Sequence, residues 1–130
     1  MTRTTLSSDS RWEPLVGYSR AVRVGPYIHV SGTTATDANG AVVAPGDAGA
    51  QAEACFRKIE DVLTRAGASL RDVVRTRIYV ADIRDSDAIG RVHRTIFETI
   101  RPAATMVEVS AFIAPDILVE IEVDAIVEDG

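Results

Sequence analysis

The segment 118–127, LVEIEVDAIV, alternates apolar and polar residues with a period of two, and it constrains the fold more than any other stretch. This alternation is typical of a β-strand with one face in the core. The apolar residues lie on one side of the predicted strand, and Glu120, Glu122 and Asp124 lie on the other. We therefore expect a sheet that is covered by apolar packing on one face and polar on the opposite face.

The rest of the hydrophobic pattern predicts four more strands and two helices. The strands are expected at 19–25, 27–34, 73–83 and 104–112, and the helices at 47–67 and 86–100. Asp47 is the expected N-cap of the first helix, and Gly67 is the expected residue just past its end. The order β-β-α-β-α-β-β predicts an α+β domain in which both helices cover one face of the sheet.

Two details of this assignment can be tested against a structure. The polar residues 1–16 are expected to form an irregular lead-in, with one domain over 17–128. In the strand at 73–83, alternation predicts two opposite faces. One face should carry Val74, Thr76, Ile78 and Val80, and the other should carry Arg75, Arg77 and Tyr79.

Composition narrows the class of protein. The chain has 130 residues, one cysteine and a formal net charge of −5, which predicts one globular domain without an internal disulfide or a multi-cysteine metal site. No apolar run is long enough to span a membrane, and no secretory signal is apparent, so we expect a cytoplasmic protein. Residues 102–130 contain seven acidic residues and no lysine or arginine, which argues against nucleic-acid binding.

Few side chains are candidates for chemistry. Cys55 lies on the apolar face of a predicted helix, where a packing role is expected. His29 and His93 have no metal-ligand spacing to other residues, so we expect no metal site. The three carboxylates of the last strand allow two interpretations. They could pair across strands with Arg75 and Arg77, or one of them could reach a cleft where burial raises its pKa for acid–base work.

Three segments together resemble the Rid family (reactive intermediate deaminase, also called YjgF or L-PSP endoribonuclease-like). They are GYSRAVRVGPYIHVSG at 17–32, VVRTRIYVADI at 73–83 and RPAATMVEVSAFIAPDILVEIEVDAI at 101–126. The resemblance implies a chorismate-mutase-like fold and a homotrimer with a central barrel, with small-molecule clefts between subunits. Active members of the family hydrolyse reactive enamines and imines, such as 2-aminoacrylate, without a metal or organic cofactor.

The resemblance also implies site residues in this chain. The cleft would include Tyr18, Ser31, Gly32 and Met106, and Glu120 would position or activate water. The family's deaminases carry an arginine that binds the substrate carboxylate, but this chain has Ala104 at that position. Arg101, three residues earlier, is the candidate substitute.

Three functions remain open from the sequence. The first is a hydrolytic deaminase that acts on an imine, an enamine or an amino-muconate-like compound. It would act poorly on 2-aminoacrylate, because Ala104 cannot bind a carboxylate. The second is a non-catalytic trimer that binds a small metabolite in the same intersubunit cleft. The third is an endoribonuclease, which the acidic composition disfavours. The expected partners are a small molecule and two further copies of the chain, with no membrane or nucleic acid.

Overall fold

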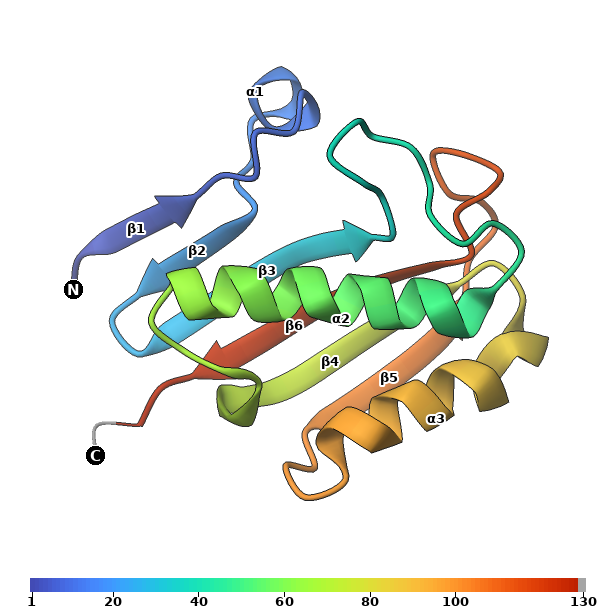
Figure 1. The fold of residues 1–130 in the computed structure, drawn as a ribbon. Helices are drawn as coiled ribbons and strands as arrows, with labels where there is room; N and C mark the ends of the chain where they lie inside the picture. The colour runs from blue at the N-terminus through green and yellow to red at the C-terminus, as the bar shows by residue number, and fades with distance from the viewer. Residues whose placement is uncertain (129–130) are drawn as a thin grey trace.

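The computed structural model describes residues 1–128 and has the α+β architecture that the sequence predicts (Figure 1). Six strands form a single sheet in the order β1-β2-β3-β6-β4-β5. The strands are β1 (Arg3–Leu6), β2 (Ala21–Val24), β3 (Tyr27–Thr34), β4 (Val73–Val80), β5 (Ala103–Glu108) and β6 (Val119–Ile126). The helices are α1 (Trp12–Val16), α2 (Ala48–Arg65) and α3 (Ser86–Phe97), with short 3₁₀ turns η1 (Leu70–Asp72) and η2 (Ile83–Asp85).

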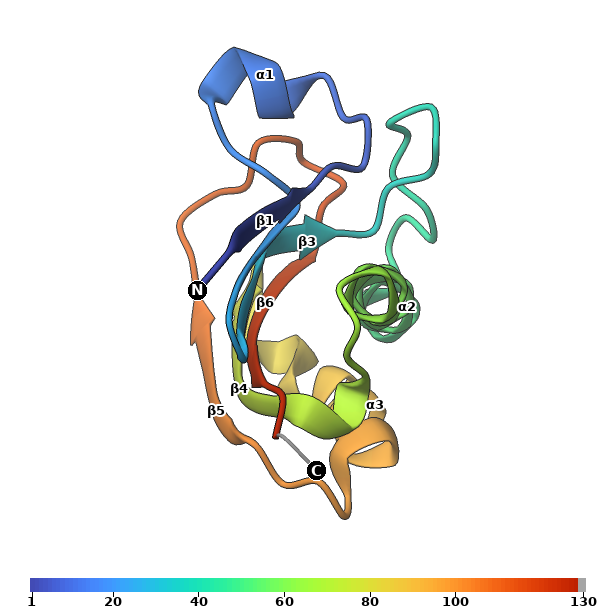
Figure 2. The same cartoon turned by 90° about the vertical axis from the view of Figure 1, so that its left-hand side faces the viewer.

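Helices α2 and α3 lie on the same face of the sheet, as predicted, and Figure 2 shows the opposite face free of helices. The β4–β5 pair is parallel, with α3 as its crossover, and the other neighbouring strands pair antiparallel. The core fills the space between helices and sheet. Its central members from β6 are Val119, Ile121 and Val123, each with no exposed surface. The one-sided burial predicted from the alternation in 118–127 is therefore confirmed.

Helix α2 begins and ends where its sequence signals predict. The Asp47 carboxylate caps the first turn by accepting a hydrogen bond from the Ala50 amide (3.0 Å). At the other end Gly67 has φ +85°, a left-handed conformation that glycine adopts without strain. Cys55 is fully buried on the apolar face of α2, and its thiol donates to the carbonyl oxygen of Thr33. The packing role of this cysteine is confirmed.

The prediction that residues 1–16 are irregular is wrong. Arg3–Leu6 form strand β1, which pairs antiparallel with β2, and Trp12–Val16 form the short helix α1 above the end of the sheet (Figures 1 and 2). The sequence RTTL has no apolar alternation, because β1 is a largely exposed edge strand. Its strand conformation comes from pairing with β2, which no local pattern reveals.

The predicted face of Val74 is also wrong. The β4–β6 register shifts between Val73 and Arg75, which marks a β-bulge. The bulge leaves Val73 3% exposed and turns Val74 outward, so that it is 42% exposed. Beyond the bulge the alternation holds, with Ile78 and Val80 in the core. One extra residue in a strand reverses the facing of the residues before it.

Candidate functional site

The candidate site is built around a second bulge, at Ser31 and Gly32 in β3. The β3–β6 register shifts between Val30 and Thr33, so these two residues stand outside the regular ladder. The Ser31 hydroxyl donates to the carbonyl oxygen of Ser19 (2.7 Å), and this bond ties the bulge to the segment that carries Tyr18. Ser31 is therefore placed to hold the backbone of the site.

Gly32 lets the Glu120 side chain lie directly against the bulge. A Cβ added at Gly32 would come within 2.1 Å of Glu120 Oε2, closer than real Cβ contacts, and within 3.0 Å of its Cδ. No residue larger than glycine fits there while Glu120 keeps this position. The carboxylate is half-buried, and in residues 1–128 it accepts no hydrogen bond from another side chain or amide.

Glu120 differs from the two other carboxylates on its face of β6. Burial raises the pKa of Glu120, the charge of Arg20 opposes the rise, and the charge of Glu122 adds to it. Burial would also raise the pKa of Asp124, but His29 and Arg77 outweigh that effect and lower it. The raised pKa brings Glu120 closer to the range useful for proton transfer at neutral pH.

Pairing across strands accounts for Glu122 and Asp124. Arg77 Nη1 donates to Asp124 Oδ2 (2.9 Å) and lies 3.7 Å from Glu122 Oε1. The Tyr79 hydroxyl donates to the same Glu122 oxygen (2.9 Å). The two interpretations of the carboxylate face therefore apply to different residues. Arg77 pairs as predicted, whereas Arg75 forms no ion pair within residues 1–128.

Arg20 lies next to this carboxylate, and the sequence reasoning missed it. Its Nη2 donates to the carbonyl oxygen of Gly32. Its Nε is fully buried and is the one buried side-chain nitrogen or oxygen in residues 1–128 without a hydrogen-bond partner. Burial lowers the pKa of the guanidinium, and the neighbouring Tyr18, Glu13 and Glu120 oppose that shift. The place of Arg20 in the predicted strand 19–25, two residues after Tyr18, was the available signal.

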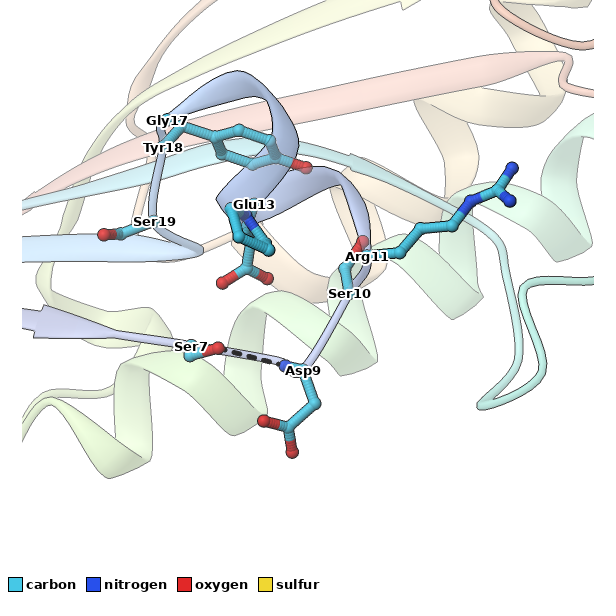
Figure 3. Close-up of a pocket in the computed structure, with 9 residues that line it drawn as sticks. Ser7, Asp9, Ser10, Arg11, Glu13, Gly17, Tyr18 and Ser19 are labelled. Carbon is cyan, nitrogen blue, oxygen red and sulfur yellow. Dashed lines mark hydrogen bonds between the residues drawn. The ribbon is translucent and has the colours of Figure 1, made fainter.

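A cavity of about 580 Å³ opens between α1 and the segment that carries Tyr18 (Figure 3). Figure 3 shows the Glu13 carboxylate below the Tyr18 ring, pointing toward the side of the pocket where Ser7 lies. Glu13 is only 5% exposed, and its Oε2 accepts hydrogen bonds from the hydroxyl (2.6 Å) and the amide (3.2 Å) of Ser8. Glu13 was also missed, because it falls in the segment expected to be irregular.

The remaining predicted site residues lie elsewhere in the same chain. Met106 is on β5, which β4 separates from β6, so two strand spacings of about 5 Å each lie between its backbone and that of Glu120. Its side chain packs against the core. Arg101 is in the turn before β5, close to the first residues of β4. Glu120 pairs with Tyr79, which is near the last residue of β4, so the two side chains belong to opposite ends of that strand. The Nε of Arg101 donates to the carbonyl oxygen of Glu98 (2.8 Å).

Residues 1–128 contain no group of three or more His, Cys, Asp or Glu side chains arranged to hold a metal ion. His29 Nδ1 lies 2.7 Å from Asp124 Oδ1, and His93 Nε2 lies 2.9 Å from Thr76 Oγ1. No helix in the same part of the chain is long and apolar enough to cross a membrane.

The fold and the site define a class of small α+β proteins, and comparison with known proteins identifies it. Residues 8–127 match the family described as Endoribonuclease L-PSP. A crystal structure of a Mycobacterium tuberculosis member of the YjgF/YER057c/UK114 family superposes with a TM-score of 0.88 at 52% identity, over 97% of this chain and 100% of that one. The chain belongs to the L-PSP family, also called YjgF or Rid, as its sequence predicts.

Named relatives include deaminases. The 3-aminoacrylate deaminase RutC of Acinetobacter baylyi is 38% identical over 108 residues, which cover 83% of this chain and 85% of that protein. The 2-iminobutanoate/2-iminopropanoate deaminase of Rattus norvegicus is 28% identical, over 98% of this chain and 91% of that protein. The family and these relatives support a deaminase-like role in general.

Proposed function

We propose that this protein is a cofactor-independent hydrolase of small imines or enamines. The observation that carries the proposal is the state of Glu120. Among the three carboxylates on this face of β6, Glu120 is the one that accepts no hydrogen bond from a described side chain, and burial raises its pKa. The names of the relatives, which act on 3-aminoacrylate and 2-iminobutanoate/2-iminopropanoate, support the reaction class.

In the proposed reaction, Glu120 takes a proton from a water molecule as the water oxygen bonds to the imine carbon. The electron pair of the C=N bond moves to nitrogen, which takes that proton from Glu120 and becomes an amine. Glu120 then removes the hydroxyl proton of the resulting carbinolamine as the C=O bond forms, and it gives this proton to the nitrogen that leaves as ammonia. An enamine first takes up a proton on carbon to become the imine. Tyr18 and the backbone at Ser31 and Gly32 would line the substrate.

The proposal is tested by comparing Glu120→Gln with Glu122→Gln, two substitutions of the same chemistry on the same face of β6. Imines generated in situ provide the screen, with ammonia release as the readout. Loss of the proton acceptor in Glu120→Gln should reduce turnover about 10²- to 10⁴-fold. Glu122→Gln retains an acceptor for the Tyr79 hydroxyl and should leave turnover and melting temperature nearly unchanged. Equal turnover in both variants would remove Glu120 from the mechanism and favour a non-catalytic metabolite-binding protein.

The substrate is proposed not to be 2-aminoacrylate, because Ala104 offers no group that can bind a carboxylate. Losing such a charged contact costs about 2–5 kcal/mol, which is at least roughly thirtyfold in rate. An assay coupled to a serine/threonine dehydratase should show slower 2-aminoacrylate hydrolysis than in a family member that carries the arginine. Ala104→Arg should make this difference in rate smaller. Activity equal to that of the relative would contradict the proposal and point to Arg101 as the substitute.

A homotrimer is proposed as the active form, with the small molecule bound between subunits. The face of the sheet opposite α2 and α3 carries no helix in a single chain (Figure 2). Within one chain, Met106 is two strands away from Glu120, and Arg101 lies near the other end of β4. Packing of copies around that face would cover it and could bring β5 of one subunit to the site of another. Light scattering at micromolar concentration should give three times the mass of one chain, and a monomer mass would contradict the proposal.

A further inference from the structure

We propose that Arg20 is a positioning residue of this site, which, with the charge of Glu13 nearby, fixes the bulge beneath Glu120 and keeps that carboxylate available as a proton acceptor. This inference deepens the proposed function and rests on it for its catalytic meaning. Its physical content, a coupling among Glu13, Arg20 and Glu120, can be measured without any substrate.

Gly32 is the point at which Arg20 and Glu120 meet. The Arg20 guanidinium donates to the Gly32 carbonyl oxygen, and the Glu120 carboxylate occupies the space where a side chain of residue 32 would lie. The Ser31 amide in turn donates to the carbonyl oxygen of Arg20 (3.0 Å). Arg20 therefore holds the bulge through its backbone and its side chain at once, and the bulge supports Glu120.

The incomplete hydrogen bonding of Arg20 shows that charge, in addition to hydrogen bonds, compensates its burial. An arginine stays protonated in proteins, and a buried charge is stable only where opposite charges or hydrogen bonds replace water. Within residues 1–128 the guanidinium makes one hydrogen bond, to Gly32, and its buried Nε has no partner. The acidic groups next to it are Glu13 and Glu120. At least one of them must stay ionised to balance the charge.

The surroundings of Glu13 favour its ionised form. Burial would raise its pKa, but the two hydrogen bonds from Ser8, a contribution from Ser7 and, to the smallest extent, the charge of Arg20 together outweigh burial and keep the pKa below the ordinary value. The negative charge of Glu13 offsets part of the Arg20 charge, so Glu120 is not the sole carboxylate that compensates the guanidinium. The N-terminal segment thereby contributes to a site that lies on the sheet.

The other charged or titratable groups near Glu120 do not replace this effect. Lys58 of α2 is engaged by the Thr34 and Thr36 oxygens and does not contribute to the pKa shift of Glu120. The groups coupled to Glu120 lie on β6, β4 and α2 and are Glu122, Tyr79 and Cys55. Each is neutral or negative when it titrates, so none can favour the ionised form of Glu120 as a cation does. Arg77, on the same face of the sheet, is engaged by Asp124 and Glu122. Arg20 is the cation that acts on Glu120.

The test is a ¹³C NMR pH titration of the Glu120 side-chain carboxyl in the full-length protein. In the wild type the midpoint should lie above 4.5, the ordinary glutamate value. Arg20→Gln should raise it further, by about one pH unit. Arg20→Lys keeps the charge and should largely restore the wild-type midpoint. Glu13→Gln should lower the midpoint, because it removes the negative charge that offsets Arg20. Arg77→Gln is the matched control and should raise the midpoint of Asp124 but leave that of Glu120.

The same Glu120 midpoint in the wild type, Arg20→Gln and Glu13→Gln would overturn the proposal, as would equal shifts in Arg20→Gln and Arg77→Gln. If Arg20→Gln does not fold, Glu13→Gln still decides the sign of the coupling. The titration needs no turnover. A protein that hydrolyses no imine but shows these shifts would therefore refute the proposed function and leave the coupling intact. Where turnover is found, the acidic limb of its pH profile should move with the Glu120 midpoint.

Discussion

Replacing Gly32 with alanine would place a methyl group on the carboxylate of Glu120. The added Cβ would lie 2.1 Å from Oε2 and 3.3 Å from Cγ, so the whole carboxylate end must swing aside. The backbone itself does not oppose the change, since Gly32 does not adopt the left-handed conformation that disfavours alanine. Gly32→Ala therefore tests where Glu120 must lie without changing its chemistry.

The effects on stability and on turnover should separate. The displaced atoms are the far end of a flexible side chain, and an off-rotamer arrangement costs about 0.5–1.5 kcal/mol. The lower backbone freedom of alanine in the unfolded chain offsets about 0.4–1 kcal/mol of this. The melting temperature should therefore stay within about 4 °C of the wild type. A catalytic carboxylate displaced by roughly 1 Å should lose about 10²-fold in turnover.

The assay pairs thermal unfolding with ammonia release from an imine that the wild type hydrolyses. Gly90→Ala is the matched control, because no atom lies within 4 Å of its added Cβ and helix α3 gains a better helix former. It should raise the melting temperature slightly and leave turnover unchanged. Turnover of Gly32→Ala within about threefold of the wild type would refute the reasoning that contact with Gly32 sets the working position of Glu120.

Three further predictions concern the core and the helices. Burial raises the pKa of Cys55 to about 12, so a thiol reagent at pH 8 should modify it only after unfolding; rapid reaction of the native protein would contradict this. Burial lowers the pKa of His93 below 6.5, so the unfolded state binds its proton more readily and the folded protein should lose stability as the pH falls below about 6.5. The melting temperature should accordingly fall more between pH 7 and pH 5 in the wild type than in His93→Gln. Asp47→Ala removes the N-cap of α2 and should cost about 1 kcal/mol in chemical denaturation, whereas Asp47→Asn should cost much less.

The sequence predicts those parts of the fold that local chemistry determines. The cap at Asp47, the left-handed Gly67 and the apolar spacing of α2 all lie within one segment, and together they define that helix. Strand β1 could not be predicted in this way, because its four residues are held by β2, which lies some fifteen positions further along the chain. The bulge before Arg75 was equally hidden, since alternation assumes a regular ladder. Local patterns identify elements, whereas pairing decides their edges and irregularities.

The site shows the same division between local and distant information. The spacing of Glu120, Glu122 and Asp124 puts three carboxylates on one face, and nothing within LVEIEVDAIV distinguishes them. Their differences come from residues more than 40 positions away. Arg77 of β4 pairs with two of the three, whereas Glu120 lies against the bulge of β3 beside Arg20.

Position 104 is alanine, so the positive charge near Glu120 must come from another residue. Within the described residues, the cation that acts on Glu120 is Arg20. Arg20 precedes β2, and β2 and β5 lie on opposite sides of β6 in the sheet. Arg20 is half-buried and bonded to Gly32, and Glu13 offsets part of its charge, so we expect it to act on the Glu120 carboxylate and not to bind a substrate anion. A site with its cation engaged in this way and alanine at position 104 should favour imines that lack a carboxylate. Paired imines that differ only in a carboxylate group should therefore be hydrolysed at different rates, with the uncharged member faster. Equal rates, or a faster carboxylate, would show that another cation, such as Arg101 from a neighbouring subunit, binds the anion.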